Sequence, residues 1–239
     1  MRILTVIVIW ALVTVLLLPG AVDYDLYSTD SWRVAIDDPI PDPFTIVAWY
    51  YLDDLTGTSS PRAWEASSDG DFMALIWHDG DYFEWRRRAA TSGLSQWTTD
   101  ASSLSSGAWF HLAVAHDGGS GCTNDPTIWI NGSSVNVTAN LTAPIGVCKT
   151  SVGSYIGVAN ADWAGRAING KVAQWAMYDG TLTTPQVQSL AAGFTPDKVA
   201  PEKLWRYMPM TGEAVELSSG ASITSVGSPT IVPGPRVFQ

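Results

Sequence analysis

Charged residues, cysteines and histidines are all scarce in this sequence. Charged residues account for 15% of its 239 positions, against roughly 25% in an average soluble protein. Acidic residues outnumber Lys and Arg by 23 to 13, which gives a formal net charge of −10. Because such a chain repels the phosphates of DNA and RNA, we expect no nucleic-acid partner. The three histidines have no further ligand at a suitable spacing, so no zinc site is expected either.

The one basic run and two of the three histidines lie at the ends of predicted strands. The one basic run, Arg86-Arg87-Arg88, follows an aromatic stretch at 82–85, and we interpret it as a solvated strand end rather than an anion site. His116 precedes Asp117 at the end of another predicted strand, and we interpret it as part of a polar turn.

Arrangements of residues that support hydrolysis are also missing. A glycosidase needs two carboxylates about 5–10 Å apart across the sugar, which two acids alternating along one strand would supply. Glu65 and Glu84 are isolated on their strands, and the other glutamates lie in the tail. No serine lies in a Gly-x-Ser-x-Gly elbow, which argues against a Ser-His-Asp hydrolase. We therefore expect a protein that is not an enzyme.

Apolar and aromatic residues, by contrast, are plentiful. Hydrophobic residues make up 46% of the chain, and 12 are Trp and 8 Tyr. Aromatic residues favour the half-buried surfaces of pleated sheets, and they also stack on sugar rings. A large sheet core accounts for most of these tryptophans.

Short apolar runs separated by Gly, Pro, Asp, Asn and Ser predict strands. Residues 109–116 alternate between apolar and small or polar positions, as in a strand with one buried face. Asp79-Gly80 and Asn131-Gly132 are signals for tight hairpins. The clearest strands are predicted at 44–51, 72–77, 82–88, 109–116, 127–130, 151–158 and 171–178.

One helix is predicted, at 184–191. Thr183 is a suitable N-cap, Pro185 lies in the first turn and Gly193 follows the end. The chain is long for one domain, but all-β sandwiches reach this length. The sequence therefore predicts an all-β, two-sheet antiparallel sandwich with one short C-terminal helix.

Residues 3–18 are apolar apart from Thr5 and Thr14 and follow one basic residue, Arg2, as in a secretory signal. The run is slightly shorter than the roughly 20 residues that span a bilayer. Three interpretations stay open: a cleaved signal peptide, a retained anchor, and a strand within an assembly. We divide the chain into this segment at 1–21, a domain at 22–217 and a Ser/Gly/Pro-rich strand and tail at 218–239. We expect a secreted or virion-surface protein, which contacts a membrane only if the segment is retained.

Cys122 and Cys148 are the only cysteines. An even number in an apparently exported chain suggests one disulfide, which would contribute roughly 3–4 kcal/mol by closing the loop between them. Two free, buried thiols are the alternative.

Four stretches of the sequence, in order, carry a family resemblance. They are an early strand ending in Trp, a Trp-x-His strand, an Asn-Gly hairpin and a closing pair of strands. These stretches lie at 44–49, 107–114, 128–132, and 155–157 with 168–172. They resemble the laminin G-like branch of the concanavalin A-like lectin/glucanase superfamily, which also includes pentraxins. The tail at 204–210 and 227–235 resembles single-domain bacterial and phage members.

The resemblance implies a jelly-roll sandwich whose rim loops bind ligands. Glucanases of the superfamily carry Glu-x-Asp-x-x-Glu or Glu-x-Asp-x-Glu on one strand, and neither pattern occurs here. Many relatives also carry an Asp-Glu pair where this chain has Ala173-Gln174. A binding module is therefore expected rather than a catalyst.

Loop residues supply the candidate ligand sites. Trp163, with Arg166 and Asn160 nearby, could stack on a sugar and hydrogen-bond its hydroxyls, although Trp163 could also fold back over the sheet edge. Hard oxygen ligands on loops suit Ca²⁺, and many relatives bind it at a rim. Such residues are also common in turns. The candidate calcium ligands are Asn124, Asp125, Asn160 and Asp162.

Asn131, Asn136 and Asn140 each begin an Asn-x-Ser/Thr sequon, which would be glycosylated only in a eukaryotic secretory pathway. The sequence favours a non-catalytic carbohydrate-binding or adhesion module, with calcium as the one candidate cofactor and a glycan or glycoprotein surface as partner. The alternative is a structural or decoration protein of a virion or cell surface, whose partners would be neighbouring subunits.

Overall fold

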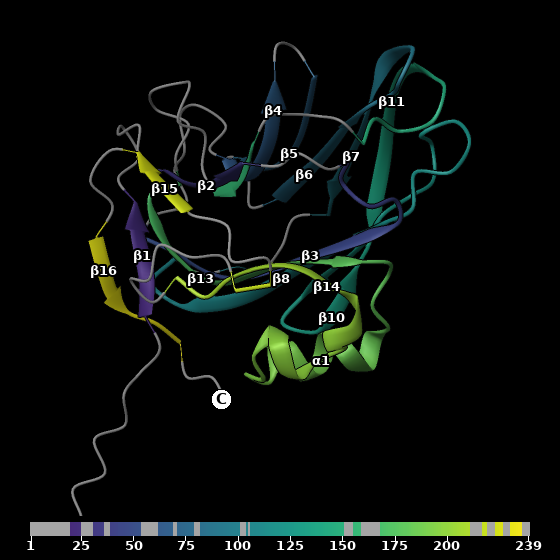
Figure 1. Ribbon diagram of the computed structural model, residues 1–239. Coiled ribbons are helices and arrows are strands. Elements are labelled where there is room, and N and C mark those ends of the chain that lie inside the picture. The colour runs from purple at the N-terminus through teal and green to yellow at the C-terminus, as the bar shows by residue number, and fades with distance from the viewer. Residues whose placement is uncertain are drawn as a thin grey trace, which may run out of the picture.

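Two antiparallel sheets pack face to face in the computed structural model, which confirms the predicted all-β sandwich (Figure 1). The structure describes residues 20–24, 31–35, 39–53, 62–68, 71–78, 82–100, 104, 106–150, 155–158, 168–210, 217–218, 223–226 and 230–235.

Sheet A is built from strands that lie far apart in the sequence. In order, it contains β10 (Ser133–Val135), β9 (Thr127–Ile130), β8 (Trp109–His116), β3 (Phe44–Leu52), β13 (Gly170–Asp179), β1 (Gly20–Tyr24) and β16 (Thr230–Pro233), with β14 (Leu204–Met208) also paired to β13. The predicted Asn131-Gly132 turn joins β9 to β10, and both turn residues have the positive φ angles that such a hairpin requires.

Sheet B packs over sheet A. In order, it contains β11 (Val137–Ile145), β7 (Ser92–Thr99), β6 (Tyr82–Arg88), β5 (Asp71–His78), β4 (Arg62–Ser68), β12 (Tyr155–Val158), β2 (Ser31–Ala35) and β15 (Ile223–Val226). The consecutive strands β10 and β11 lie at the edges of different sheets, and so do β15 and β16. The predicted Asp79-Gly80 turn lies outside the described residues.

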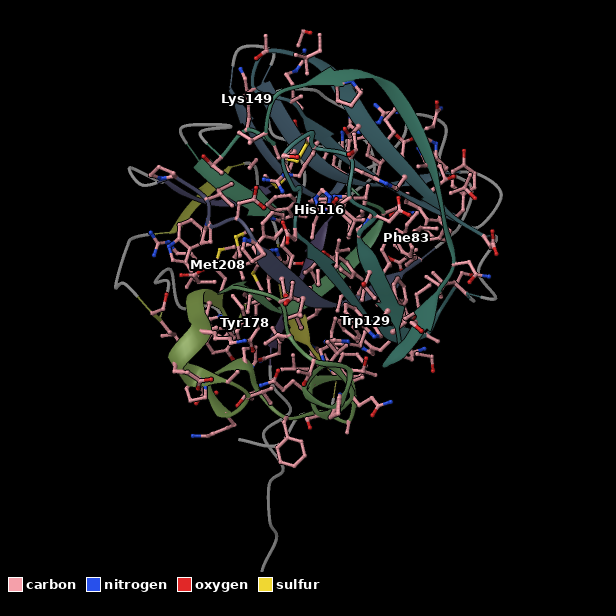
Figure 2. All side chains as sticks on the ribbon, turned by 90° about the vertical axis from the view of Figure 1, so that its right-hand side faces the viewer. Phe83, His116, Trp129, Lys149, Tyr178 and Met208 are labelled. Atoms are coloured by element: carbon pink, nitrogen blue, oxygen red, sulfur yellow. A yellow bond between two sulfur atoms is a disulfide. The ribbon has the colours of Figure 1, made fainter. Side chains whose placement is uncertain are left out.

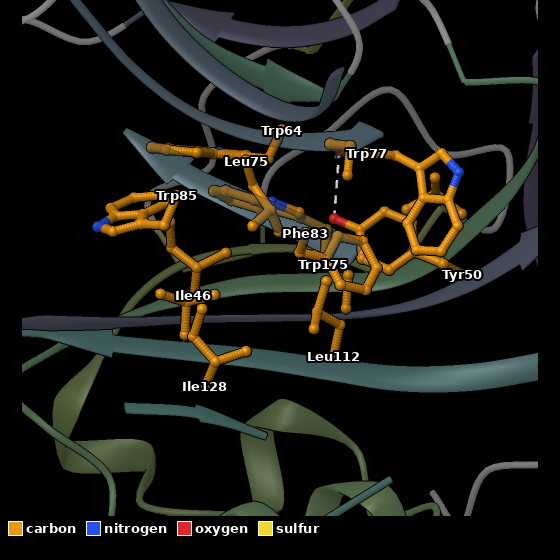
Figure 3. Close-up of a cluster of buried hydrophobic side chains, with 14 of the residues drawn as sticks. Ile46, Tyr50, Trp64, Leu75, Trp77, Phe83, Trp85, Leu112, Ile128 and Trp175 are labelled. Carbon is orange, nitrogen blue, oxygen red and sulfur yellow. Dashed lines mark hydrogen bonds between the residues drawn. The ribbon is translucent and has the colours of Figure 1, made fainter. Parts of the chain in front are cut away.

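Aromatic side chains from both sheets fill the space between them (Figure 3). Trp64 and Trp85 of sheet B are fully buried and stack with their ring centroids 5.8 Å apart. Tyr50 of sheet A donates its hydroxyl hydrogen to the Ala63 carbonyl oxygen, at 3.2 Å, so its one polar group is satisfied. Burial of such large side chains stabilises a fold by roughly 2 kcal/mol each. Of the nine tryptophans whose burial the structure describes, five lie buried in this core, so the prediction that a sheet core holds most of them is confirmed for the described residues.

The predicted helix, α1 (Thr184–Ala191), lies against the outer face of sheet A (Figure 1). Val187 and Leu190 of α1 are buried there in one cluster with Ala113 and Trp129. Two short 3-10 helices, η1 (Pro196–Lys198) and η2 (Pro201–Lys203), follow α1. The prediction of one buried face for 109–116 is wrong, because α1 covers the face of β8 that would otherwise meet solvent.

A bulge in β13 lies at Gln174. Gln174 interrupts the pairing of β13 with β3 and has a φ of 53°, and it is only 4% exposed. Its backbone N–H donates to the Pro209 carbonyl oxygen at 3.3 Å, and its side-chain oxygen accepts a hydrogen bond from the Tyr207 hydroxyl. Gln174 therefore packs the β14 segment against β13.

The apolar segment at 3–18 lies outside the described residues. β1 begins at Gly20, so cleavage after Ala21 would remove the first two residues of that strand. Within the described ranges, no helix combines the length and the apolar character needed to cross a membrane.

Candidate functional site

A disulfide joins the loop between β8 and β9 to the segment that follows β11. Cys122 and Cys148 are bonded, with their Cα atoms 4.6 Å apart, which confirms the predicted pairing. Both cysteines are buried beside Ala89, at the end of β6. Gly118 passes so close to Cys148 that a Cβ atom there would overlap the sulfur. The loop is therefore held tightly against sheet B.

A buried arginine, Arg87, lies beneath this loop. The interpretation of 86–88 as a solvated strand end is therefore wrong for Arg87. Arg87 has no exposed surface, because odd positions of β6 face the core. Its guanidinium donates to Asp42 Oδ1 at 3.0 Å and lies 5.0 Å from the centre of the Phe44 ring. Burial lowers the pKa of Arg87, and the hydrogen bond to Asp42 opposes that shift. Asp42 provides the counter-charge that a buried cation needs.

His116 connects Arg87 to the loop, so its interpretation as a surface turn residue is also wrong. It is only 1% exposed and lies below the yellow disulfide bond in Figure 2. Its Nδ1 lies 3.2 Å from Trp85 Nε1 and 3.3 Å from an Arg87 nitrogen, both of which are N–H donors. Nδ1 must therefore accept, and Nε2 carries the hydrogen that is donated to the Asn124 carbonyl oxygen at 2.9 Å. Burial, reinforced by the charge of Arg87, lowers the pKa of His116 to about 3.

Asn124 and Asp125, two of the predicted calcium ligands, lie in the β8–β9 loop just after Cys122 and are exposed. Asp125 Oδ1 accepts a hydrogen bond from Trp97 Nε1 at 2.9 Å, so its carboxylate is anchored to the core. The other two predicted ligands, Asn160 and Asp162, lie outside the described residues, as do Trp163 and Arg166. The described part of the chain contains no group of three or more His, Cys, Asp and Glu side chains that could hold a metal ion. Calcium takes six to eight oxygen ligands, and the predicted site stays a prediction.

Sheet B also carries an ordered set of polar side chains on the face turned away from the core. Phe83 and Trp85 of β6 point into the core, so the alternate residues Glu84 and Arg86 point outward. Strand pairing aligns the outward residues in two rows. One row is Arg62, Ile76, Glu84 and Thr98, and the other is Glu65, Ala74, Arg86 and Gln96. We call Arg62, Glu65, Glu84, Arg86 and Gln96 the outer polar face.

Each acid of the outer polar face is paired with an arginine. Glu84 accepts hydrogen bonds from Arg86 Nε and from Gln96 Nε2, the latter at 2.9 Å. Its other oxygen lies 2.7 Å from His78 Nε2. Glu65 Oε2 lies 3.6 Å from Arg62 Nε. Charge pairing therefore fixes these carboxylates in position.

Exposure decides which of these groups a ligand can reach. Arg62, Glu65 and Glu84 are 5–6% exposed, whereas the Arg86 side chain is 24% exposed and that of His78 is 18% exposed. His78 also stacks in parallel on Tyr82, with ring centroids 4.8 Å apart. The groups that a ligand can reach therefore include the planar side chains of Arg86 and His78, which both contact the buried Glu84.

This face was not predicted, because Glu65 and Glu84 were interpreted as isolated on their strands. The period-two alternation of Glu84 and Arg86 was visible in the sequence. The order of β4, β5 and β6, which brings Glu65 into the same face, was not.

A family model for the Concanavalin A-like lectin/glucanases superfamily matches residues 28–188. The chain belongs to this superfamily. Solved structures agree with this lectin-like fold. A proposed carbohydrate binding protein from Bacteroides ovatus superposes with a TM-score of 0.65 at 16% identity, over 91% of this chain and 60% of that protein. A SAP-like pentraxin from Limulus polyphemus superposes with a TM-score of 0.54 at 12% identity, over 91% of this chain and 96% of the pentraxin. No curated protein matches the sequence.

The three sequon asparagines of this lectin-like domain are all exposed. Asn131 accepts a hydrogen bond from the His111 backbone N–H through its side-chain oxygen, at 2.9 Å. Asn136 donates to Asp100 at 3.1 Å, and Asn140 lies on β11. Glycosylation at these positions stays a prediction.

Proposed function

We propose that this protein is a non-catalytic carbohydrate-binding or adhesion module that acts outside the cell. The outer polar face of sheet B is the observation that carries this proposal. The opposite face of the sandwich is apolar and covered by α1, whereas this face presents Arg86, Gln96 and the stacked rings of His78 and Tyr82.

The chemistry of these side chains suits a sugar. Guanidinium and amide groups hydrogen-bond to hydroxyls in fixed directions, and aromatic rings pack against the apolar face of a pyranose. Arg86 and Gln96 both donate to Glu84, so their planes are oriented before a ligand arrives. Such preorganisation lowers the entropic cost of binding.

The same contacts argue against hydrolysis. A glycosidase needs one carboxylic acid that can donate its proton and one carboxylate that can attack or activate water. Glu84 accepts hydrogen bonds from Arg86 and Gln96, and Glu65 faces Arg62. Paired in this way, neither acid is set up to give a proton to a leaving group.

Calcium and the loop residues Trp163, Arg166 and Asn160 are part of the same proposal. A calcium ion would draw on Asn124 and Asp125 together with Asn160 and Asp162, and would orient sugar hydroxyls at the rim.

Screening on a glycan array, with and without calcium, tests the proposal. We expect binding that falls about tenfold or more in Arg86→Gln and in Gln96→Ala, because each loses a directed hydrogen bond. Lys198→Ala, an exposed change beyond α1, is the matched control and should bind normally. Trp163→Ala tests the loop separately.

An array without signal in either condition would contradict carbohydrate binding. Turnover of a polysaccharide panel by the wild-type chain would contradict the non-catalytic assignment.

A further inference from the structure

A pocket lies on the other side of the sandwich from the outer polar face. It is formed by the β8–β9 loop, by β9 and by the start of α1. Its volume is about 380 Å³, within the range of sites for small organic molecules and too large for a lone metal ion. Its floor consists of Ala115, Trp129 and Leu182, which are buried in the cluster on the outer face of sheet A.

Hydrogen bonds and the disulfide hold the walls of this pocket in place. Asp125 is anchored by Trp97 Nε1 at 2.9 Å. The Leu182 N–H donates to the Thr45 hydroxyl at 2.9 Å, and Lys203 donates to the Thr181 carbonyl at 3.2 Å. Because these contacts come from the sheets and from η2, the pocket is formed before any ligand enters.

The lining of the pocket calls for a ligand rich in hydrogen-bond donors. Among the described residues that line it, the charged side chains are those of Asp117 and Asp125. Among the described residues, Asp117 accepts a hydrogen bond at Oδ1 from the Gly119 N–H, at 3.1 Å, and Asp125 accepts one at Oδ1 from Trp97 Nε1. The second oxygen of each carboxylate is left for a ligand. At the start of α1, the Thr183 N–H donates to the Gln186 side-chain oxygen.

Trp129 gives the floor of the pocket an aromatic surface. Its side chain is 4% exposed and lines the pocket, and threonines line it as well. A ligand that carries both a cation and hydroxyl groups would meet the two aspartates and the threonine side chains, and its carbon skeleton would pack on the Trp129 ring.

We propose that this pocket binds a hydroxylated primary amine of monosaccharide size, such as an amino sugar with a free ammonium group. The ammonium lies between Asp117 and Asp125, and the carbon skeleton packs on Trp129 and Leu182. This site goes beyond the proposed glycan-binding face, because it uses none of the residues of the outer polar face.

Titration calorimetry with three sugars of one shape tests the charge requirement. Glucosamine should bind at least about tenfold more tightly than glucose or N-acetylglucosamine, which lack the cation. Added salt should weaken glucosamine binding, because the pocket is open to solvent. Equal affinity for glucose and glucosamine would overturn the proposal, and so would the absence of glucosamine binding at millimolar concentration.

Variants locate the site. Asp125→Asn and Asp117→Asn keep an oxygen for Trp97 and Gly119 but remove the charge, and each should weaken glucosamine binding about tenfold or more. Asp53→Asn removes the same charge at the other end of β3 and should have no effect. Glucosamine binding that survives both pocket variants would overturn the proposal. Calcium binding that is abolished by both and excludes glucosamine would also overturn it in favour of a metal site.

The outcome is independent of the proposed glycan-binding face. Arg86→Gln should leave glucosamine affinity unchanged, and Asp117→Asn should leave the glycan-array profile unchanged. Loss of glucosamine binding in Arg86→Gln would overturn the assignment of the amine to this pocket.

Discussion

Lowering the pH from 7 to 5 should destabilise this protein substantially through two buried histidines. His111 and His116 are each 1% exposed, and burial lowers the pKa of both to about 3. At His116 the reason is visible in the contacts, because a proton on Nδ1 would face the N–H groups of Trp85 and Arg87. In the unfolded chain, both histidines regain a pKa of about 6.5.

The sign and size of the effect follow from proton linkage. Between the unfolded and folded pKa values, the unfolded chain binds two protons that the folded chain does not, so stability falls as the pH falls. A pH of 5 is about 1.5 units below the histidine pKa of the unfolded chain, which corresponds to a loss of about 2 kcal/mol of unfolding free energy per histidine. The two together remove about 4 kcal/mol, a large part of a typical stability of about 5–15 kcal/mol. The loss continues until the pH reaches the folded pKa of about 3.

Urea unfolding followed by tryptophan fluorescence measures this directly at pH 7 and pH 5. In His116→Gln, the difference in unfolding free energy between the two pH values should fall to about half, whatever the variant's absolute stability. His111→Gln should behave in the same way. A pH difference that is unchanged in His116→Gln would refute the reasoning, because it would mean that this side chain does not titrate differently on folding.

Three further changes test other parts of the fold. Arg87→Met leaves Asp42 without its buried partner and should cost about 3–5 kcal/mol in thermal or urea unfolding, whereas Lys198→Met at the surface should cost less than about 0.5. Replacing both Cys122 and Cys148 by serine should cost about 3–4 kcal/mol, and a stability equal to wild type would show that the disulfide does not restrain the unfolded chain. Gln174→Gly should be tolerated better than Gln174→Ala, since both lose the side-chain contacts but only glycine relieves the positive φ. The reverse order would contradict the described bulge.

Features that depend on neighbouring residues in the chain could be predicted from the sequence. The predicted bounds of the strands at 82–88, 109–116 and 127–130 agree with the structure residue for residue, because alternation and flanking turn residues are local signals. The same is true of the helix after Thr183, whose N-cap and proline are adjacent in the chain. The disulfide was predictable because the chain has only two cysteines.

Features that depend on which strands become neighbours were decided by the tertiary structure alone. Arg87 looked like a solvated strand end because Asp42, its partner 45 residues earlier, cannot be identified from local sequence. Glu65 joins the outer polar face through the pairing of β4 with β5, and the pocket forms because α1 returns to lie beside β9. A strand's own sequence specifies that its side chains alternate, but the burial and charge partners of each one are set by segments far along the chain.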